Sequence, residues 1–141
     1  MSNLSVGFIR GSIIWLLVGI GLGLIMAFPD GFGWLTAIGL GQPSLAHAHA
    51  LLPGFLLMML MGVGYHIFPR FTGNPLRWPW LGQANLWCSW VGTTGQVLGF
   101  FCRGLVPWLL PVGASIQTVG LICFAINVWQ VVRPLKPLKP M

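Results

Sequence analysis

The stretch AHAHALLPGFLLMMLMGVGYHIFPRF, residues 46–71, decides the fold of this chain. It is almost continuously apolar, and at 1.5 Å rise per residue a helix of this length crosses the ~30 Å hydrocarbon layer of a bilayer. The same stretch contains His47, His49 and His66, which are all the histidines of the sequence. Polar groups inside a membrane are costly and are therefore functional candidates. The segment predicts a membrane-spanning helix that carries a functional site.

Three further apolar runs have a similar length, and together the four predict an all-α, integral membrane four-helix bundle. We expect the spans at residues 8–28, 45–68, 80–102 and 108–132, so that residues 1–132 form one transmembrane domain in the lipid bilayer. The composition agrees, because 56% of the residues are hydrophobic and 6% are charged, whereas soluble domains are about a quarter charged. Residues 133–141 are predicted to form a Pro- and Lys-rich cytoplasmic tail.

The basic residues predict the orientation of the spans, because short cytoplasmic loops of membrane proteins are enriched in Lys and Arg. Basic residues precede the first span, separate the second from the third, and follow the fourth: Arg10, Arg70, Arg77, Arg133, Lys136 and Lys139. Only Arg103 lies on the other side. We expect a multi-pass protein of a bacterial or archaeal cytoplasmic membrane with both termini in the cytoplasm. Since the basic excess is a topology signal, nucleic acid is not an expected ligand.

Some kinds of chemistry are disfavoured by what the sequence lacks. Asp30 is the only acidic residue, so general acid-base catalysis by paired carboxylates is not expected. The three cysteines, Cys88, Cys102 and Cys123, have no metal-ligand spacing, and we expect them to pack as small apolar residues.

Other residues within the spans are predicted to join helices. Polar side chains near the middles of the third and fourth spans are expected to form hydrogen bonds between helices. These are Thr93, Thr94, Gln96 and Gln117. Small residues at four-residue spacing let helices approach closely, as in the glycine pairs at 19 and 23 and at 95 and 99.

The spacing of His47 and His49 indicates what they could bind. Two residues turn a helix by ~200°, so the two imidazoles are expected on opposite sides of the helix. A single chelated Zn or Cu ion would instead need side chains three or four residues apart. A flat cofactor on each side of the helix suits the pair, and haem does so because its iron accepts axial imidazoles from two different helices. We predict that His47 and His49 are ligands of haem iron.

His66 is predicted to lie outside that site. It is 17 residues beyond His49, or roughly 25 Å along a helix, near the opposite membrane surface. One interpretation is an interfacial histidine beside Tyr65. A second haem site and a proton-pathway role are the alternatives.

The stretch HAHALLPGFLLMMLMGVGYHIFPRF resembles the second helix of a four-helix unit from the haem-copper oxidase subunit I superfamily, closest to the C-type oxidases and nitric oxide reductases. In that superfamily twelve helices form three four-helix arcs, and the second helix of each arc carries histidines near the outer face. His47-Ala48-His49 resembles the pair whose two members face the two haems.

The chain also departs from that superfamily, since it holds one arc and lacks the histidines of a copper site and the glutamates around a non-haem iron. The resemblance therefore implies a homotrimer that mimics the twelve-helix ring, with His47 of one copy and His49 of the next binding each haem. The haem is expected to be haem b, because the sequence has no CxxCH motif. Arg103 is either a partner of a haem propionate or a simple loop charge.

Six-coordinate haem iron has no open position, so the expected function is electron transfer, as in a cytochrome b. Two alternatives stay open. If one histidine does not bind the haem iron, the site could bind oxygen or nitric oxide as a reductase or sensor. Whether the protein has an oxidoreductase activity is therefore undecided. The other alternative is a haem-free structural or assembly subunit of a respiratory complex. The sequence does not identify an electron donor or acceptor.

Overall fold

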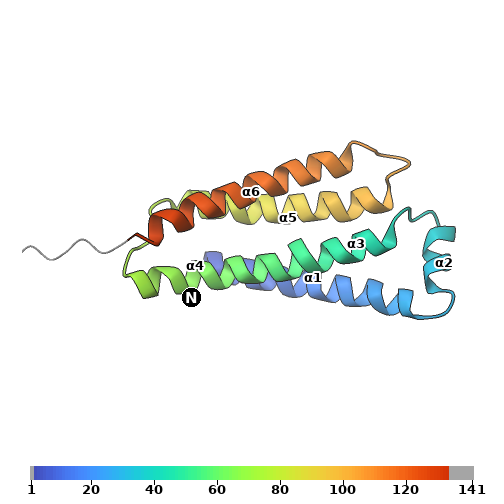
Figure 1. Cartoon of the computed structure of the whole chain (residues 1–141), viewed down its shortest axis with the longest axis horizontal. Coiled ribbons are helices and arrows are strands. Elements are labelled where there is room, and N and C mark those ends of the chain that lie inside the picture. The colour runs from blue at the N-terminus through green and yellow to red at the C-terminus, as the bar shows by residue number, and fades with distance from the viewer. Residues whose placement is uncertain (1, 134–141) are drawn as a thin grey trace, which may run out of the picture.

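The computed structural model describes residues 2–133, which are helical along most of their length and contain no β-strand. The elements in chain order are α1 (Asn3–Ala27), α2 (Gly31–Ala37), α3 (Pro43–His49), the π-helix η1 (Ala50–Leu57), α4 (Met58–Thr72), α5 (Pro79–Phe101) and α6 (Leu109–Val131). Because α3, η1 and α4 follow one another without a break, they form one helix, Pro43–Thr72. The long helices run alongside one another, and α2 lies across one end (Figure 1). The predicted tail, apart from Arg133, lies outside the described residues.

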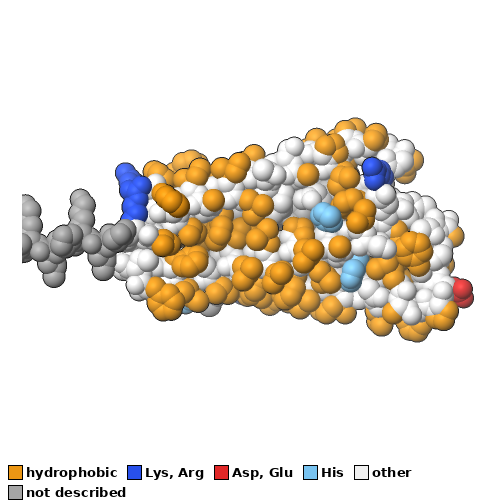
Figure 2. Space-filling model, in the orientation of Figure 1, with side chains coloured by type: hydrophobic (Ala, Val, Ile, Leu, Met, Phe, Trp, Pro, Cys, Tyr) orange, Lys and Arg blue, Asp and Glu red, His pale blue; other side chains and the backbone are white. Residues whose placement is uncertain are grey.

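Within residues 2–133, three helices are long and apolar enough to cross a membrane: α1, the Pro43–Thr72 helix and α6. Figure 2 shows hydrophobic side chains along the length of the visible face, with charged groups near its ends. The molecule is therefore all-α, and its apolar helices indicate a membrane protein. α5 has 23 residues but is not among the three, since its sequence includes many glycines and polar side chains. A fourth span along α5 stays a prediction.

The helix ends follow local rules of sequence. Ser2 is the N-cap of α1, and its hydroxyl oxygen accepts the backbone N–H of Ser5 at 3.2 Å. Pro79 lies at the start of α5, where the missing N–H of proline removes no helical bond. α4 ends at Gly73, whose φ of 68° is a left-handed conformation that glycine adopts without strain. These signals fix where the long helices begin and end.

The histidine-bearing helix is irregular after His49. Pro53 lies inside η1, where it offers no N–H, and in an α-helix its ring would collide with the carbonyl group four residues before it, that of His49. A π-helix uses bonds between residues five apart, which widens the turn and relieves this conflict. The expectation of a regular helix is therefore wrong over residues 50–57, although His47 and His49 themselves lie in the α-helical part.

α5 and α6 pack so closely that backbone touches backbone. A Cβ atom added to Gly92 would lie 2.6 Å from the backbone nitrogen of Gln117, which leaves no room for a side chain. Gly95 and Gly99, the predicted packing glycines of this helix, also face the backbone of α6. The glycines thus act as the contact surface of an α5–α6 hairpin.

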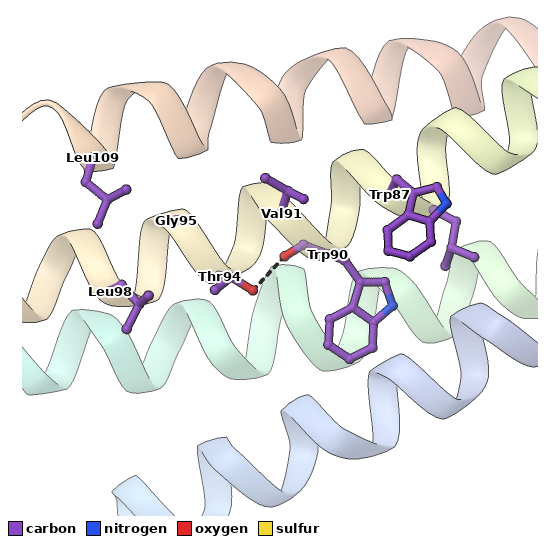
Figure 3. A pocket seen from close by; sticks show the side chains of 8 residues that line it. Trp87, Trp90, Val91, Thr94, Gly95, Leu98 and Leu109 are labelled. Carbon is purple, nitrogen blue, oxygen red and sulfur yellow. Dashed lines mark hydrogen bonds between the residues drawn. The ribbon is translucent and has the colours of Figure 1, made fainter.

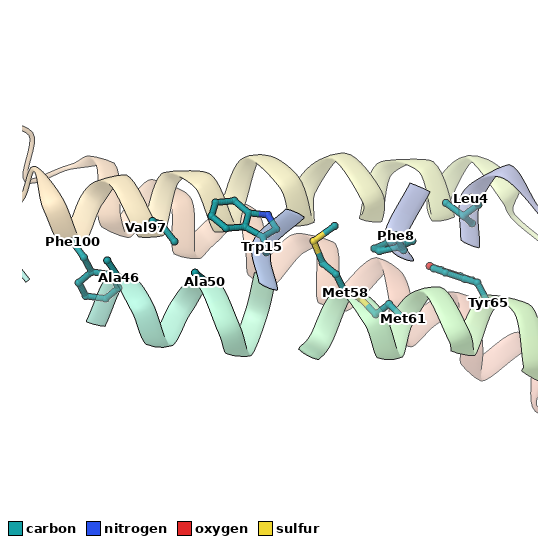
Figure 4. Close-up of a cluster of buried hydrophobic side chains, with 10 residues drawn as sticks. All are labelled: Leu4, Phe8, Trp15, Ala46, Ala50, Met58, Met61, Tyr65, Val97 and Phe100. Carbon is teal, nitrogen blue, oxygen red and sulfur yellow. The ribbon is translucent and has the colours of Figure 1, made fainter. Parts of the chain in front are cut away.

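A cluster of buried side chains joins α1 to the histidine-bearing helix and to α5 (Figure 4). Phe8, Met58 and Met61 are fully buried. The ring of Trp15 packs directly on Gly54 of η1, where an added Cβ would lie 2.7 Å from the Trp15 Cγ atom. This packing holds α1 against the helix that presents the histidines.

Candidate functional site

His47 is turned from α3 toward α1. Its Nδ1 atom lies 2.8 Å from the carbonyl oxygen of Gly19, one helix away. The ring also packs on Gly23, since a Cβ atom there would lie only 2.8 Å from the His47 Cε1 atom. The two glycines of the first span, predicted to serve packing, therefore make room on α1 for the histidine-bearing helix and its imidazole.

His49 is turned toward α5 instead. The centroid of its ring lies 4.6 Å from that of Phe100, with the two planes inclined at 50°. Its Nδ1 atom lies 3.0 Å from the carbonyl oxygen of Leu45 on the same helix. The two imidazoles therefore point to different neighbours, as their two-residue spacing predicts. Figure 2 shows histidine side chains reaching the surface among hydrophobic groups, toward the end of the molecule that carries α2.

The hydrogen bonds of both rings assign the tautomer. A carbonyl oxygen only accepts, so the Nδ1 atoms of His47 and His49 must each carry the proton and donate it. In a neutral imidazole the other nitrogen, Nε2, then keeps its lone pair. Histidines that bind metals have this arrangement, because the bond from one ring nitrogen to a carbonyl or carboxylate orients the other toward the metal. Both rings are half-buried, so each is held at a surface of the monomer.

His66 is not brought to this pair. It lies on α4, and its Nε2 atom accepts a hydrogen bond from the guanidinium group of Arg70 one turn away. The nitrogen that is the candidate ligand atom in His47 and His49 is thus engaged by a cation in His66. This geometry fits an interfacial histidine better than a second haem ligand.

Arg103 lies at the same end of the molecule as His47 and His49. Its NH1 group donates to the Oε1 atom of Gln42 at 3.0 Å, immediately before α3. The side chain is exposed just after α5 ends. The structure therefore places Arg103 beside the start of the histidine-bearing helix, in contact with a neutral side chain.

No conventional metal cluster accompanies the two histidines. Within residues 2–133, no group of three or more His, Cys, Asp or Glu side chains is arranged to hold an ion. The three cysteines are free and half-buried, in agreement with a packing role.

A buried polar cluster that was not predicted from the sequence lies at the other end of α5. Asn85 is fully buried, and its Nδ2 atom donates to the Tyr65 hydroxyl at 3.1 Å, while its Oδ1 atom accepts from Ser89 at 3.2 Å. Asn127 of α6 is also fully buried and donates to the carbonyl of Trp78 at 3.1 Å. The available signal was the four-residue spacing of Asn85, Ser89 and Thr93, which places them on one helix face.

The predicted polar contacts between spans are present in part. Thr93 donates to the Oε1 atom of Gln117 at 3.0 Å and so joins α5 to α6. Thr94 and Gln96 instead donate to carbonyl groups of α5 itself, those of Trp90 and Gly92. Only the Thr93–Gln117 pair therefore acts between helices.

An apolar groove of about 570 Å³ runs along α5, and neither His47 nor His49 lines it (Figure 3). It is lined by Leu86, Trp87, Trp90, Val91, Thr94, Gly95, Leu98 and Leu109. The hydroxyl of Thr94, its one polar side chain apart from the indoles, is already donated to the carbonyl of Trp90 at 2.8 Å. The groove offers apolar contact and no ligand to a metal, so it is separate from the histidine site.

No protein-family model matches this chain, and comparisons with curated proteins and with solved structures find no match. The resemblance of residues 47–71 to haem-copper oxidase subunit I therefore stays a prediction from the sequence.

Proposed function

We propose that this chain is a haem b-binding integral membrane protein that transfers electrons through bis-histidine haem. One observation carries the proposal: His47 and His49 donate their Nδ1–H groups to backbone carbonyls, which leaves both Nε2 lone pairs for axial ligation. Haem bound by two imidazoles would supply a one-electron iron couple without an open coordination position.

The donor set fits this cofactor. The two rings lie on opposite sides of α3, against α1 and against α5, so they cannot share one iron within a single helix. The hydrogen bonds that the two imidazoles donate to the carbonyl groups of Gly19 and Leu45 hold each ring in one orientation. These residues would bind and orient the cofactor and limit the access of water to it.

The proposal includes a homotrimer in the membrane. A ligand on each side of one helix is suited to a ring in which His47 of one copy and His49 of its neighbour bind the same iron. Each copy would contribute four spans, α5 included, and keep both termini in the cytoplasm, as the distribution of basic residues favours. Closed symmetry would then give every copy the same two contacts.

The decisive experiment is a reduced-minus-oxidised absorption spectrum of the protein in detergent, with and without carbon monoxide. We expect a b-type α band that the gas leaves unchanged. A shift of the Soret band by carbon monoxide would favour a gas-binding reductase or sensor. A protein that takes up no haem, even after haem is supplied, would contradict the proposal and favour a structural subunit.

Substitution of the three histidines identifies the ligands. His47→Ala and His49→Ala should each abolish the low-spin haem spectrum. His66→Ala is the matched control, because it removes an imidazole from the same helix that is already bonded to Arg70. Loss of the spectrum only with His66→Ala would move the site to the other end of the helix.

A further inference from the structure

The loop before α3 is tied to the end of α5 by three hydrogen bonds. The backbone N–H of Gly41 donates to the carbonyl of Phe101 at 2.9 Å, and that of Gln42 donates to the carbonyl of Phe100 at 3.1 Å. The guanidinium of Arg103 adds the bond of 3.0 Å to the Gln42 side chain. We refer to these five residues as the 41–103 clamp.

The clamp joins two helix ends that need partners. The last carbonyl groups of a helix have no intrahelical donor, and those of Phe100 and Phe101 close α5. Gln42 is the residue immediately before the first turn of α3. The clamp therefore fixes the start of the histidine-bearing helix against the end of α5.

Phe100 connects the clamp to the candidate site. Its carbonyl accepts from Gln42, while its buried ring lies 4.6 Å from the ring of His49. A shift of Gln42 along α5 would therefore move the His49 ring against Phe100. The guanidinium group of Arg103 donates a hydrogen bond to the Gln42 side chain and so restrains the position of Gln42.

We infer that Arg103 and Gln42 are positioning residues for His49, and that Arg103 acts through Gln42 and not as a partner of a haem propionate. The effect on haem rests on the proposed function. The clamp itself is a property of the polypeptide and can be tested without haem.

The first test is hydrogen exchange of haem-free protein in detergent, followed by mass spectrometry of peptides covering residues 38–49. Arg103→Ala and Gln42→Ala should each speed exchange at the amides of Gly41 and Gln42 roughly tenfold, the scale expected for one lost hydrogen bond. Arg70→Ala, at the other end of the molecule, is the control and should leave these amides unchanged. Unaltered exchange in both clamp variants would overturn the inference.

The second test uses haem-loaded protein and compares electron paramagnetic resonance g-values and midpoint potentials. Arg103→Ala and Gln42→Ala should change the g-values alike, the double variant should change them no further, and Gln42→Glu should keep the original values because it retains the acceptor. Arg103→Ala removes a positive charge and is expected to lower the midpoint potential by either route, so the g-values decide. A change of the g-values with Arg103→Ala but not with Gln42→Ala would show a direct role of Arg103 and overturn the inference. Absence of haem from the unmodified protein would refute the proposed function alone, and the exchange experiment would then decide on the clamp.

Discussion

The Nδ1 atom of His47 lies 2.8 Å from the carbonyl oxygen of Gly19, so the orientation of a candidate ligand on α3 is set by the backbone of α1. Backbone carbonyl groups inside a helix already accept one hydrogen bond, and their second lone pair can accept another. The contact needs no polar side chain on α1. A helix whose sequence shows only apolar and small residues at this point can thus determine the geometry of a half-buried imidazole.

Replacing Gly23 should disturb this orientation. In Gly23→Ala the new Cβ would lie 2.8 Å from the His47 Cε1 atom, so the ring must shift from the position in which it bonds to Gly19. We expect roughly tenfold weaker haem binding, as for loss of an outer-shell partner, measured by haem titration of the apoprotein. Gly21→Ala is the matched control, because nothing lies within 4 Å of a Cβ at that position. Equal losses in the two variants would mean that the effect is not steric.

Removal of the hydroxyl of Thr93 should loosen α5 from α6. Thr93→Val deletes the bond to Gln117, and interhelical hydrogen bonds in membranes contribute about 1 kcal/mol to the free energy of unfolding. Denaturation in mixed detergent micelles would measure the loss. Thr94→Val removes the neighbouring hydroxyl, which bonds only within α5, and should cost less. A larger effect at Thr94 would contradict the assignment of the interhelical contact.

Asn85→Leu should destabilise the protein more than loss of either of its partners. The substitution leaves the buried hydroxyls of Tyr65 and Ser89 without Asn85, at a cost of about 1–3 kcal/mol in unfolding free energy. The double variant with Asn85→Leu and Tyr65→Phe should be more stable than Asn85→Leu alone, because it no longer contains the Tyr65 hydroxyl that lost its partner. Thermal unfolding of the single and double variants would measure this difference in stability. Strictly additive losses would indicate that Asn85 and Tyr65 do not act together.

Gly92→Ala should strain the α5–α6 hairpin. The added methyl group would meet the backbone of Gln117, which cannot rotate away, so we expect a loss of about 1–3 kcal/mol in unfolding free energy. Gly33→Ala in α2 is the control, since nothing lies within 4 Å of its Cβ and alanine favours helix. If thermal unfolding shows no difference between the variants, the hairpin contact is looser than the structure indicates.

The sequence predicted the long helices well because apolar runs, and the residues that begin and end helices, are local signals. The predicted run 80–102 corresponds to Pro79–Phe101, and the run 108–132 to Leu109–Val131. It gave no sign of α2, which is short and rich in glycine. It also did not foresee the π-helix, because whether a proline kinks, ends or widens a helix depends on how neighbouring helices accommodate it.

For the candidate site, the sequence could identify His47 and His49 and predict that they lie on opposite sides of their helix. The opposite directions of His47 and His49 follow from helix geometry alone. The acceptors Gly19 and Leu45 were not predictable, since a carbonyl group carries no sequence signature. Asn85 was not predicted because a polar residue near the end of a span normally faces headgroups, whereas here α4 with Tyr65 and α6 at Gly120 pack against it.

The π-helix also sets how this protein can change in length. A widened turn holds one residue more than an α-helix of the same span, and Pro53 keeps this turn widened because its ring would collide with the His49 carbonyl in an α-helix. Deletion of one residue between His49 and Tyr65 could therefore not be absorbed by the widened turn, and it would rotate everything before it by ~100° relative to α4. His47 would then lose its contact with α1, and His49 would lose its contact with Phe100. Related chains that keep both contacts should therefore keep the number of residues between His49 and Tyr65 unchanged, even where the identities of those residues drift.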